Sequence, residues 1–362
     1  MAAEPGAERR LKNMRILIIR LSAIGDVIMA SGLIAALRSL YPDSHIAWLT
    51  ESGNADLLAH HPELDQLHLW PRRQWRALRQ QGNWPEFLRQ SVRLIQTLRA
   101  EHYDLVLDLQ GLLKSGIWAW LSGGRRRIGL GSREGSQFLM TETCDRHVDS
   151  PLIGKEYRKL AALLGASPAS FQQGVYCSPT DQEAAAGLLA RHDIKQDYIL
   201  LAPYTTRPQK HWQAARWIEL AQHLTAISHL PVLLLGGPGD QVEARAWLAQ
   251  TDTALFDLTG QTPLGVAAAL IAKARLLLGV DTGLTHLALV MNTPTLALFG
   301  STCPYLDTGK PHARVLYTPL PCSPCRRHPS CDQRYDCMAS HTVDTVLAEA
   351  LTLLNPADQE PA

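Results

Sequence analysis

The chain has 362 residues, which predicts two domains, because a domain ordinarily holds about 150 residues. Apolar residues make up 46% and charged residues 19%, a composition that indicates a folded chain with a sizeable core and excludes a disordered one. The 35 bases and 34 acids nearly balance, so the net charge of +1 gives no reason to expect a nucleic-acid partner.

The first residues carry no sign of export. Residues 1–13 are polar and lack the apolar stretch of a secretory signal, so we expect a disordered extension, with Met14 as an alternative start. No apolar run in the chain approaches the roughly 20 residues that span a bilayer. We therefore expect a cytoplasmic protein in which the seven cysteines are mostly reduced.

Strands and helices alternate in the first half of the chain. Apolar runs predict buried strands at residues 15–20, 45–49 and 105–109. Apolar spacing predicts helices over residues 27–40, which end at Tyr41-Pro42, and over residues 86–100. This order predicts an α/β domain with a parallel sheet covered by helices on both faces, ending near residue 176.

The second half repeats the pattern over residues 177–340. A helix should open at Pro179, because Thr180 precedes Glu183 by the spacing of a capping box. Further helices are expected over residues 214–227 and 242–249. Strands are expected at residues 198–202, 232–235, 276–280 and, as the last of the set, 295–299.

Polar residues gather in the loops that follow these strands. In parallel sheets, ligands bind at the carboxyl ends of the strands. The loops in that position are residues 21–26, 110–115, 203–210, 236–240, 281–283 and 300–304. We therefore predict a ligand cleft between two domains.

The stretch Asp281-Thr282-Gly283 follows a predicted strand and precedes a helix that carries His286. Backbone N–H groups at a helix start and the Thr282 hydroxyl would suit a phosphate or another anion. Two other interpretations stay open. His286 could be a structural histidine, and Asp281 could be only the helix cap.

A second candidate anion site lies in "LAPYTTRPQKHW", where Thr205, Thr206, Arg207 and Lys210 follow a strand. Two hydroxyls and one or two cations suit a diphosphate, whose charge must be neutralised as it leaves. A capped loop with exposed bases is the alternative. Two anion sites in one domain favour a nucleoside diphosphate, although the chain has no P-loop motif.

A glycine turn in "LLLGGPGDQVEARA" is followed by Asp240 and Glu243. Either acid could accept hydrogen bonds from ribose hydroxyls, as in other nucleotide-binding α/β sheets. An ordinary turn with a helix cap explains the same residues.

Asp26 follows the first strand, within "RILIIRLSAIGDVIMA". A carboxylate at this carboxyl end would face the cleft opposite the diphosphate, where it could remove a proton from an acceptor hydroxyl. It could equally cap the helix that starts at Val27.

Two further groups could carry charge or metal. Arg72, Arg73, Arg76 and Arg79 form an Arg cluster that could contact anions or simply be solvated. The second group has one C-x-x-C pair but lacks the second pair of a zinc ribbon, so a zinc site, disulfides and free thiols all stay open. It consists of Cys322, Cys325, Cys331 and Cys337.

Taken together, the motifs resemble the ADP-heptose-dependent heptosyltransferases of lipopolysaccharide core synthesis, which form glycosyltransferase family 9. The resemblance rests on "IIRLSAIGDVIMASGLIAALR", "DLVLDLQGLLKSG", "TTRPQKHW", "LLLGGPGD", "VDTGLTHLA" and "NTPTLALFGST". The stretches "DLQGLLKSG" and "RIGL" look more like the heptosyltransferase I branch, which adds the first heptose to Kdo of lipid A.

The resemblance implies a GT-B fold of two Rossmann-like domains and an inverting transfer that needs no metal or other cofactor. Asp26 matches the proposed base, held by the Gly25 turn, and Lys210 with Thr205 and Thr206 matches the diphosphate site. The implied donor residues also include Asp281, Thr282, Gly283, His286 and either Asp240 or Glu243. A helix within residues 341–362 would cross back onto the N-terminal domain.

The implied acceptor is Kdo-lipid A, possibly with phosphorylated Kdo, bound by a peripheral enzyme at the inner face of the cytoplasmic membrane. The residues implied to bind it are Ser22, Gly25, Arg72, Arg73, Arg76, Gln110 and Lys114. Arg20, where the branch often has Lys, and the four-cysteine insert are departures that bear on the acceptor. Another nucleotide-sugar transferase of the same fold and a catalytically silent nucleotide-binding protein are the competing interpretations.

Overall fold

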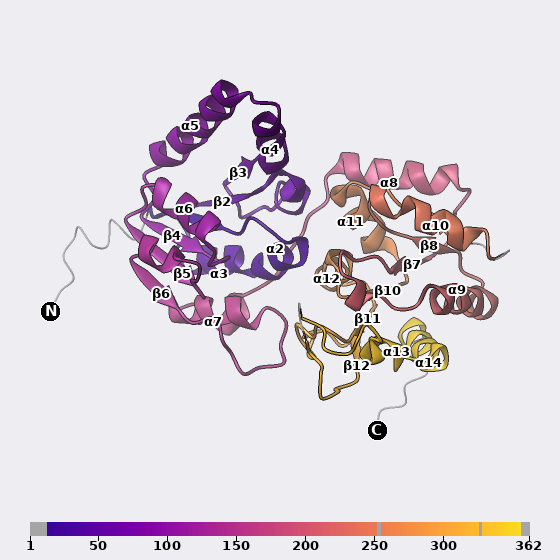
Figure 1. Ribbon diagram of the computed structural model, residues 1–362. Coiled ribbons are helices and arrows are strands. Elements are labelled where there is room, and N and C mark those ends of the chain that lie inside the picture. The colour runs from indigo at the N-terminus through magenta and orange to yellow at the C-terminus, as the bar shows by residue number, and fades with distance from the viewer. Residues whose placement is uncertain (1–12, 252–254, 326–327, 356–362) are drawn as a thin grey trace. The chain divides into compact units, whose positions relative to one another are not determined.

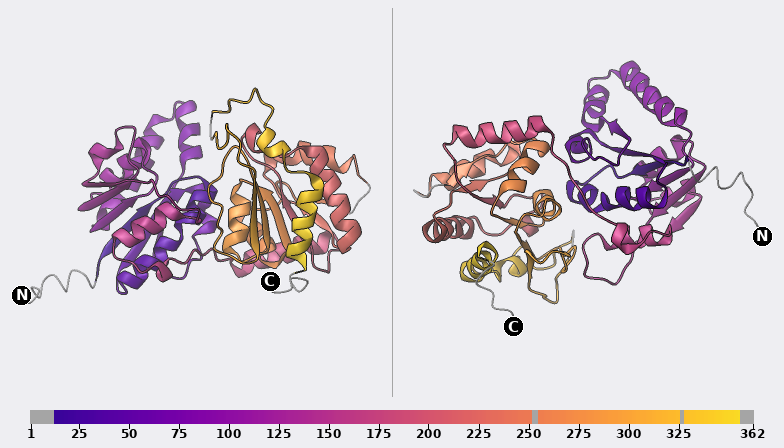
Figure 2. Two further views of the ribbon diagram at one scale, coloured as in Figure 1. Left: turned by 90° about the horizontal axis from the view of Figure 1, so that it is seen from below. Right: turned by 180° about the vertical axis from the view of Figure 1, so that it is seen from behind.

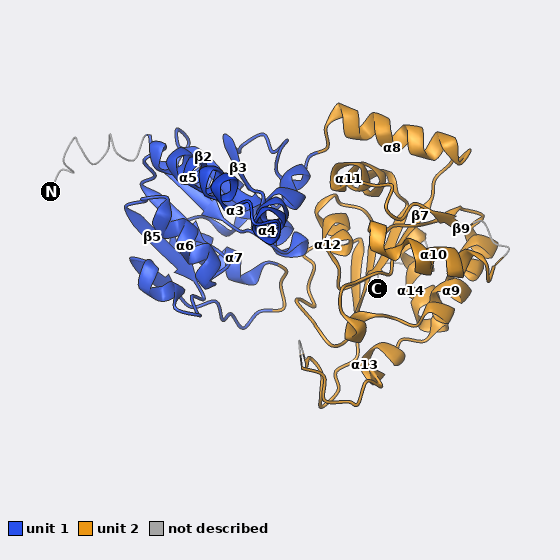
Figure 3. Ribbon diagram, turned by 45° about the horizontal axis from the view of Figure 1, so that its top comes forward, with its two compact units in different colours: residues 1–150, 154–176 blue, residues 151–153, 177–362 orange. Residues whose placement is uncertain are grey.

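A computed structural model describes residues 13–251, 255–325 and 328–355. The chain divides into two compact units (Figure 3). Unit 1 holds residues 1–150 and 154–176, and unit 2 holds residues 151–153 and 177–362. The disordered extension that we expected at the N-terminus falls on residues 1–12, outside the described residues.

Unit 1 is built on a six-stranded sheet with the order β3-β2-β1-β4-β5-β6, in which every pairing is parallel. The predicted strands correspond to β1 (Arg15–Ile19), β2 (His45–Glu51) and β4 (Leu105–Asp108). We did not predict β3 (Gln66–Trp70), β5 (Arg126–Leu130) or β6 (Glu142–Cys144). These strands lie towards the edges of the sheet, and their short sequences carry polar or charged residues that hide the strand pattern.

Helices cover the sheet of unit 1 (Figure 1). They are α2 (Ile24–Ala30), α3 (Gly32–Leu40), α4 (Arg72–Gln80), α5 (Trp84–Ala100), α6 (Leu113–Leu121) and α7 (Lys155–Leu163). The helix predicted over residues 27–40 is two helices, because the chain breaks at Ser31, whose hydroxyl donates to the Ile28 carbonyl at 2.8 Å. Side chains of α4, α5 and α6 share one apolar core with β1 and β2, so these three helices cover the same sheet face.

Unit 2 has a second six-stranded parallel sheet, of order β12-β11-β10-β7-β8-β9. Its strands are β7 (Ile199–Ala202), β8 (Val232–Leu234), β9 (Leu255–Asp257), β10 (Leu276–Val280), β11 (Thr295–Phe299) and β12 (Ala313–Tyr317). The expectation that residues 295–299 form the last strand was wrong, since β12 follows and pairs with β11. The two parallel sheets confirm the predicted α/β class.

The helices of unit 2 are α8 (Pro179–Arg191), α9 (Ala214–Ser228), α10 (Gln241–Leu248), α11 (Leu264–Lys273), α12 (Gly283–Val290), α13 (Asp336–Ala339) and α14 (Val343–Leu354). The start of α8 differs from the prediction. Ser178 caps the helix by accepting from the Asp181 N–H at 3.0 Å, so the capping box lies two residues before the Thr180–Glu183 pair that the spacing predicted.

The last helix, α14, lies against the sheet of unit 2 (Figure 2). Its buried side chains Val346, Ala350 and Leu353 join the apolar core formed with α9, β10 and β11. This corrects the expectation that the helix crosses back onto the N-terminal domain. An amphipathic helix is stabilised by whichever apolar surface covers its stripe, and here that surface belongs to unit 2.

Among the described residues, no helix combines the length and the apolar composition that crossing a membrane requires.

Candidate functional site

Asp26 occupies the first turn of α2, directly after the carboxyl end of β1. Its Oδ2 pairs with Arg20 Nη2 at 2.5 Å and accepts from the Ala23 N–H at 3.2 Å, so Asp26 does support the start of the helix. Its side chain keeps 33% of its surface exposed, and no bond to Oδ1 is found among the residues that the structure describes. One carboxylate oxygen is therefore fixed while the other can meet a ligand.

Arg20 is the side chain that holds Asp26. It is buried at 5% exposure, and its Nη1 donates to the Leu109 carbonyl at 2.8 Å while Nη2 contacts Asp26. The planar guanidinium makes both contacts at once, which fixes the direction of the carboxylate.

The loop after β4 supports the loop after β1. Gln110 Oε1 accepts from the Leu21 N–H at 3.0 Å. Buried Asp108 accepts from the N–H groups of Gln110 and Gly111 and from the Ser115 hydroxyl, all within 3.1 Å. Burial raises the pKa of Asp108, although these hydrogen bonds favour its ionised form. Gln110, predicted to bind acceptor, is thus already engaged in holding the Asp26 loop.

A carboxylate missed by sequence reasoning organises the predicted cations. Glu51 Oε1, at the end of β2, lies 3.1 Å from Arg72 Nη1 and 3.9 Å from Lys114 Nζ. Burial and the charge of Arg72 lower the pKa of Lys114. Arg73 and Arg76 are exposed on α4, with no ion pair to any described residue. The position of Glu51 after a strand was the available signal.

Two further candidates in unit 1 lie beside Asp26. Ser22 is half-buried in the loop before α2. Gly25 is buried and already helical, so the expected turn is shorter than the stretch from Ser22 to Gly25.

Asp281, at the end of β10, is the most heavily bonded carboxylate of unit 2. Lys210 Nζ lies 2.6 Å from Oδ2, and His286 Nε2 lies 3.1 Å from Oδ1. The Thr302 hydroxyl also donates to Oδ2. Burial alone would raise the pKa of Asp281, but the hydrogen bond from His286 and the charge of Lys210 hold it well below its usual range.

His286 links this group to the loop after β11. Its Nδ1 lies 2.7 Å from the hydroxyl of Tyr305, and both side chains are buried. Burial and the Asp281 charge raise the pKa of Tyr305, so its hydroxyl keeps its proton. When the Tyr305 hydroxyl donates to Nδ1 and Nε2–H donates to Asp281, a neutral His286 satisfies both partners.

The structure answers the question whether Asp281 is a helix cap. The N-cap residue of α12 is Thr282, and its side chain makes no capping hydrogen bond. The Asp281 carboxylate is directed to Lys210 and His286 instead. Thr282 and Gly283 therefore place a hydroxyl and the first turn of α12 beside a fixed cation, an arrangement that suits an anionic ligand.

The remaining donor candidates lie on two loops of unit 2. Thr205 is half-buried, and its carbonyl accepts from His211 Nε2 at 2.8 Å, while Thr206 is exposed. Asp240 Oδ2 accepts from the Gly237 N–H at 2.7 Å and so caps its own turn. Glu243 is exposed in the first turn of α10. Of the two acids, Glu243 has the less engaged carboxylate.

The four clustered cysteines form no disulfide with one another. Burial and the charges of neighbouring cysteines raise the pKa of both Cys325 and Cys337, which indicates that the four thiols lie near each other. Across residues 13–251, 255–325 and 328–355, no group of three or more His, Cys, Asp or Glu side chains is arranged to hold a metal ion.

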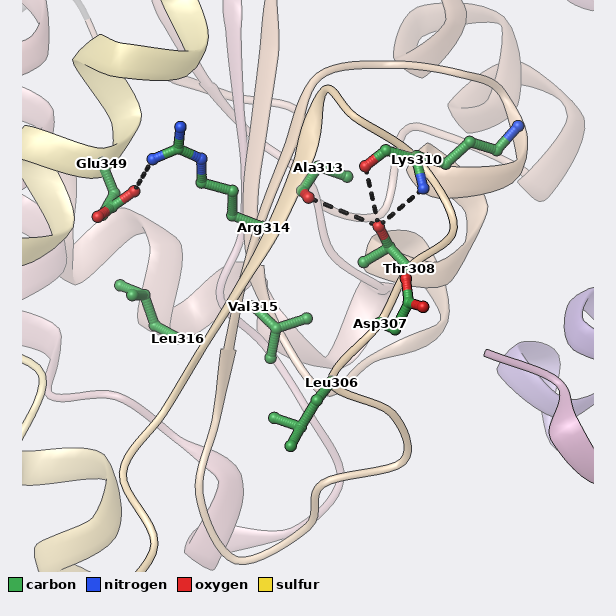
Figure 4. A pocket seen from close by; sticks show the side chains of 9 residues that line it. All are labelled: Leu306, Asp307, Thr308, Lys310, Ala313, Arg314, Val315, Leu316 and Glu349. Atoms are coloured by element: carbon green, nitrogen blue, oxygen red, sulfur yellow. Dashed lines mark hydrogen bonds and ion pairs between the residues drawn. The ribbon is translucent and has the colours of Figure 1, made fainter. Parts of the chain in front are cut away.

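A cavity of about 370 Å³ beside β12 contains none of the predicted site residues (Figure 4). The Arg314–Glu349 ion pair, at 2.5 Å, lines it and joins β12 to α14. The Thr308 hydroxyl, also in the lining, donates to the carbonyls of Lys310 and Ala313 at 3.2 and 3.5 Å.

Comparison with known proteins gives a family match. The sequence profile described as "Glycosyltransferase family 9 (heptosyltransferase)" matches residues 91–336. Lipopolysaccharide heptosyltransferase 1 of Pseudomonas aeruginosa is 30% identical over 324 residues, covering 86% of each chain. Lipopolysaccharide heptosyltransferase 1 of Escherichia coli strain K12 is 26% identical, covering 82% of this chain and 91% of the relative.

Solved structures show the same fold. Escherichia coli ADP-heptose lipopolysaccharide heptosyltransferase II superposes with a TM-score of 0.74 at 23% identity, covering 96% of this chain and all of that one. Escherichia coli heptosyltransferase WaaC with ADP-2-deoxy-2-fluoro heptose gives a TM-score of 0.70 at 23% identity, covering 93% and 98%. The fold, with two units that are each built on a parallel sheet, is thus that of the GT-B heptosyltransferase structures.

Proposed function

Because the chain belongs to glycosyltransferase family 9, the heptosyltransferases, we propose that it transfers heptose from ADP-heptose to Kdo of lipid A in lipopolysaccharide core synthesis. The proposed site of action is the inner face of the cytoplasmic membrane, where such an acceptor is anchored. The resemblance of "DLQGLLKSG" and "RIGL" to the heptosyltransferase I branch supports this choice of acceptor.

Asp26 is the proposed general base. Its Oδ1 takes the proton of an acceptor hydroxyl, the hydroxyl oxygen attacks the anomeric carbon of the heptose, and ADP leaves from the opposite face. The configuration at that carbon is inverted. The observation that carries the proposal is the half-engaged carboxylate, because Arg20 fixes Oδ2 and leaves Oδ1 for the substrate.

Lys210 is the proposed cation for the leaving diphosphate. Asp281 holds its ammonium group next to Thr282 and the first turn of α12, so an incoming phosphate meets a positive charge that is already oriented. We propose that Lys210 and the backbone N–H groups in the first turn of α12 neutralise the diphosphate without a metal ion. Thr205, Thr206, Gly283 and His286 complete the proposed donor site, with Glu243 or Asp240 on the ribose.

Acceptor binding is assigned to the cations around Glu51. Arg72 and Lys114 are held in place by that carboxylate, and Arg73 and Arg76 extend the positive charge along α4. Kdo carboxylates and lipid A phosphates are anions that Arg binds well. Ser22, Gly25 and Gln110 shape the loop next to them.

The test is incubation of the purified protein with ADP-heptose and a panel of acceptors, with and without excess EDTA. The panel contains Kdo-lipid A with one Kdo, two Kdo or phosphorylated Kdo, and products are identified by mass spectrometry. We expect one added heptose on at least one acceptor and unchanged turnover in EDTA. Hydrolysis or transfer from another nucleotide sugar, with no product from ADP-heptose, would assign a different donor.

A further inference from the structure

The outer face of α6 is apolar although it is exposed. Leu113, Ile117 and Trp120 follow each other at helical spacing, and each keeps 40–51% of its surface exposed. The opposite side of the helix, with Trp118 and Ala119, already fills the core of unit 1. The exposed stripe therefore has no packing partner among the described residues.

A second apolar stripe lies on α5. Trp84, Leu88 and Val92 are spaced four residues apart and are 49–55% exposed, whereas Phe87 and Leu94 of the same helix pack on the core. Helices α5 and α6 contact each other on the same sheet face (Figure 1). We call these six exposed residues of α5 and α6 the apolar face.

The short helix beside α6 adds to this surface. Residues Ser136–Leu139 contact α6, and Phe138 at their centre is 85% exposed. Phe138 therefore adds exposed apolar surface next to the stripe of α6.

The same layer of helices is strongly basic, although the whole chain has a net charge of only +1. Four Arg residues lie on α4, three on α5 and one Lys on α6, against a single acid, Glu86. Glu86 is paired with Arg89 at 2.7 Å. Arg93 is exposed on α5 and makes no ion pair with the described part of the chain.

We propose that the apolar face is a membrane-docking surface, by which unit 1 lies on a bilayer rich in anionic lipids. Trp84 and Trp120 enter the boundary between headgroups and acyl chains, while the Arg side chains of α4 and α5 contact lipid phosphates. The inference rests on the proposed function in one respect: an enzyme docked on the bilayer would reach an acceptor that is anchored in the same bilayer.

The charge and the residue types favour a bilayer over another protein. A protein partner of a basic patch supplies a few acids at fixed positions. Anionic lipids present a continuous negative potential, which suits seven Arg side chains on α4 and α5 and one Lys on α6. Tryptophan is enriched where proteins meet the membrane interface, because its ring is apolar and its indole N–H is polar.

Binding to vesicles tests the proposal without any sugar substrate. The full chain is sedimented with vesicles of phosphatidylcholine containing about one third phosphatidylglycerol, at about 0.1 M salt, and with phosphatidylcholine alone. We expect binding to the anionic vesicles, with a blue shift of tryptophan emission, and at least about tenfold weaker binding to the neutral ones.

Variants separate the apolar from the electrostatic contribution. The double substitution Ile117→Gln and Trp120→Gln should weaken vesicle binding about tenfold or more, and Arg93→Glu should weaken it several-fold in low salt only. Val242→Gln on α10, at a side chain 79% exposed, is the matched control and should bind like the native chain. Circular dichroism and thermal melts confirm that all variants are folded.

The outcomes distinguish this inference from the proposed activity. Failure of the native chain to bind anionic vesicles, or unchanged binding by the double variant, overturns the docking surface even if heptose is transferred. A dimer that disappears in the double variant, without vesicle binding, would assign the face to a second copy and also overturn it. Vesicle binding that depends on the apolar face supports the inference even if no acceptor in the panel is used.

Discussion

Asp26 in unit 1 and Asp281 in unit 2 both follow the carboxyl end of a central strand, yet their surroundings differ. Asp26 has one cationic partner and a third of its side chain exposed, whereas Asp281 is 11% exposed and bonded through both oxygens. A carboxylate whose oxygens are all engaged cannot accept a substrate proton without losing a partner. The comparison therefore supports the proposal that Asp26 acts as the base, whereas Asp281 positions Lys210 and His286.

Substitution of Asp26 should have the largest effect. Asp26→Asn keeps the shape and the Ala23 contact but removes the base, so we expect turnover to fall about 100- to 10,000-fold with donor affinity nearly unchanged. Steady-state kinetics and calorimetric titration with ADP measure the two quantities. Turnover near that of the native chain would remove Asp26 from the mechanism.

Asp281→Asn should act mainly on stability. It leaves the Lys210 ammonium group buried without its counter-charge, so we expect the free energy of unfolding to fall by about 3 kcal/mol. Asp240→Asn, which disturbs only the cap at Gly237, is the control and should cost about 1 kcal/mol. Equal losses in urea unfolding would contradict the contrast between the two acids.

The pH dependence of stability distinguishes Asp281 further. Because its pKa is held below the usual range, the ionised carboxylate stabilises the folded state above about pH 4, and this contribution is lost as the pH falls further. The native chain should therefore lose stability in acid more steeply than Asp281→Asn. Unfolding curves measured from about pH 3 to about pH 7 check this difference, because carboxyl groups titrate in roughly this range.

Lys210→Met should weaken ADP binding about 10- to 100-fold and lower turnover, because the side chain keeps most of its length but loses the charge that we propose neutralises the diphosphate. Lys310→Met, a lysine of the same unit that contacts Asn292 rather than an acid, serves as the control. An unchanged ADP binding isotherm in the Lys210 variant would exclude its diphosphate role.

The smallest effect is expected for Arg20→Lys. Lysine keeps the charge beside Asp26 but cannot hold Asp26 and the Leu109 carbonyl with one planar group, so we expect about tenfold lower turnover and unchanged ADP binding. Native turnover in this variant would show that the direction of the Asp26 carboxylate does not limit the rate.

The central strands and the loops that follow them could be predicted because continuous apolar runs such as "RILII" are typical of buried parallel strands. Two side chains that bond to Asp281 and His286 could not. Thr302 and Tyr305 follow β11, and only the pairing of β10 with β11 brings that loop to Asp281. Glu51 was missed for the same reason, since its contacts with Arg72 and Lys114 join segments distant in sequence.

The position of the last helix, α14, also differs from the sequence-based expectation, and packing explains why. The apolar stripe of residues 343–354 predicts a helix, but a stripe does not specify which core it covers. In the structure it covers β10 and β11 of its own unit, and the Trp212 indole N–H donates to the His341 carbonyl just before it at 2.9 Å.

The position of α14 has a consequence for synthesis. Leu353 and Leu354, almost the last described residues, are buried in the core of unit 2. During translation this core cannot close until the final helix has left the ribosome, whereas every residue of unit 1 has been made by residue 176. Unit 1 can fold while translation continues, and a premature stop before residue 343 would release unit 2 with an exposed sheet that chaperones and proteases recognise.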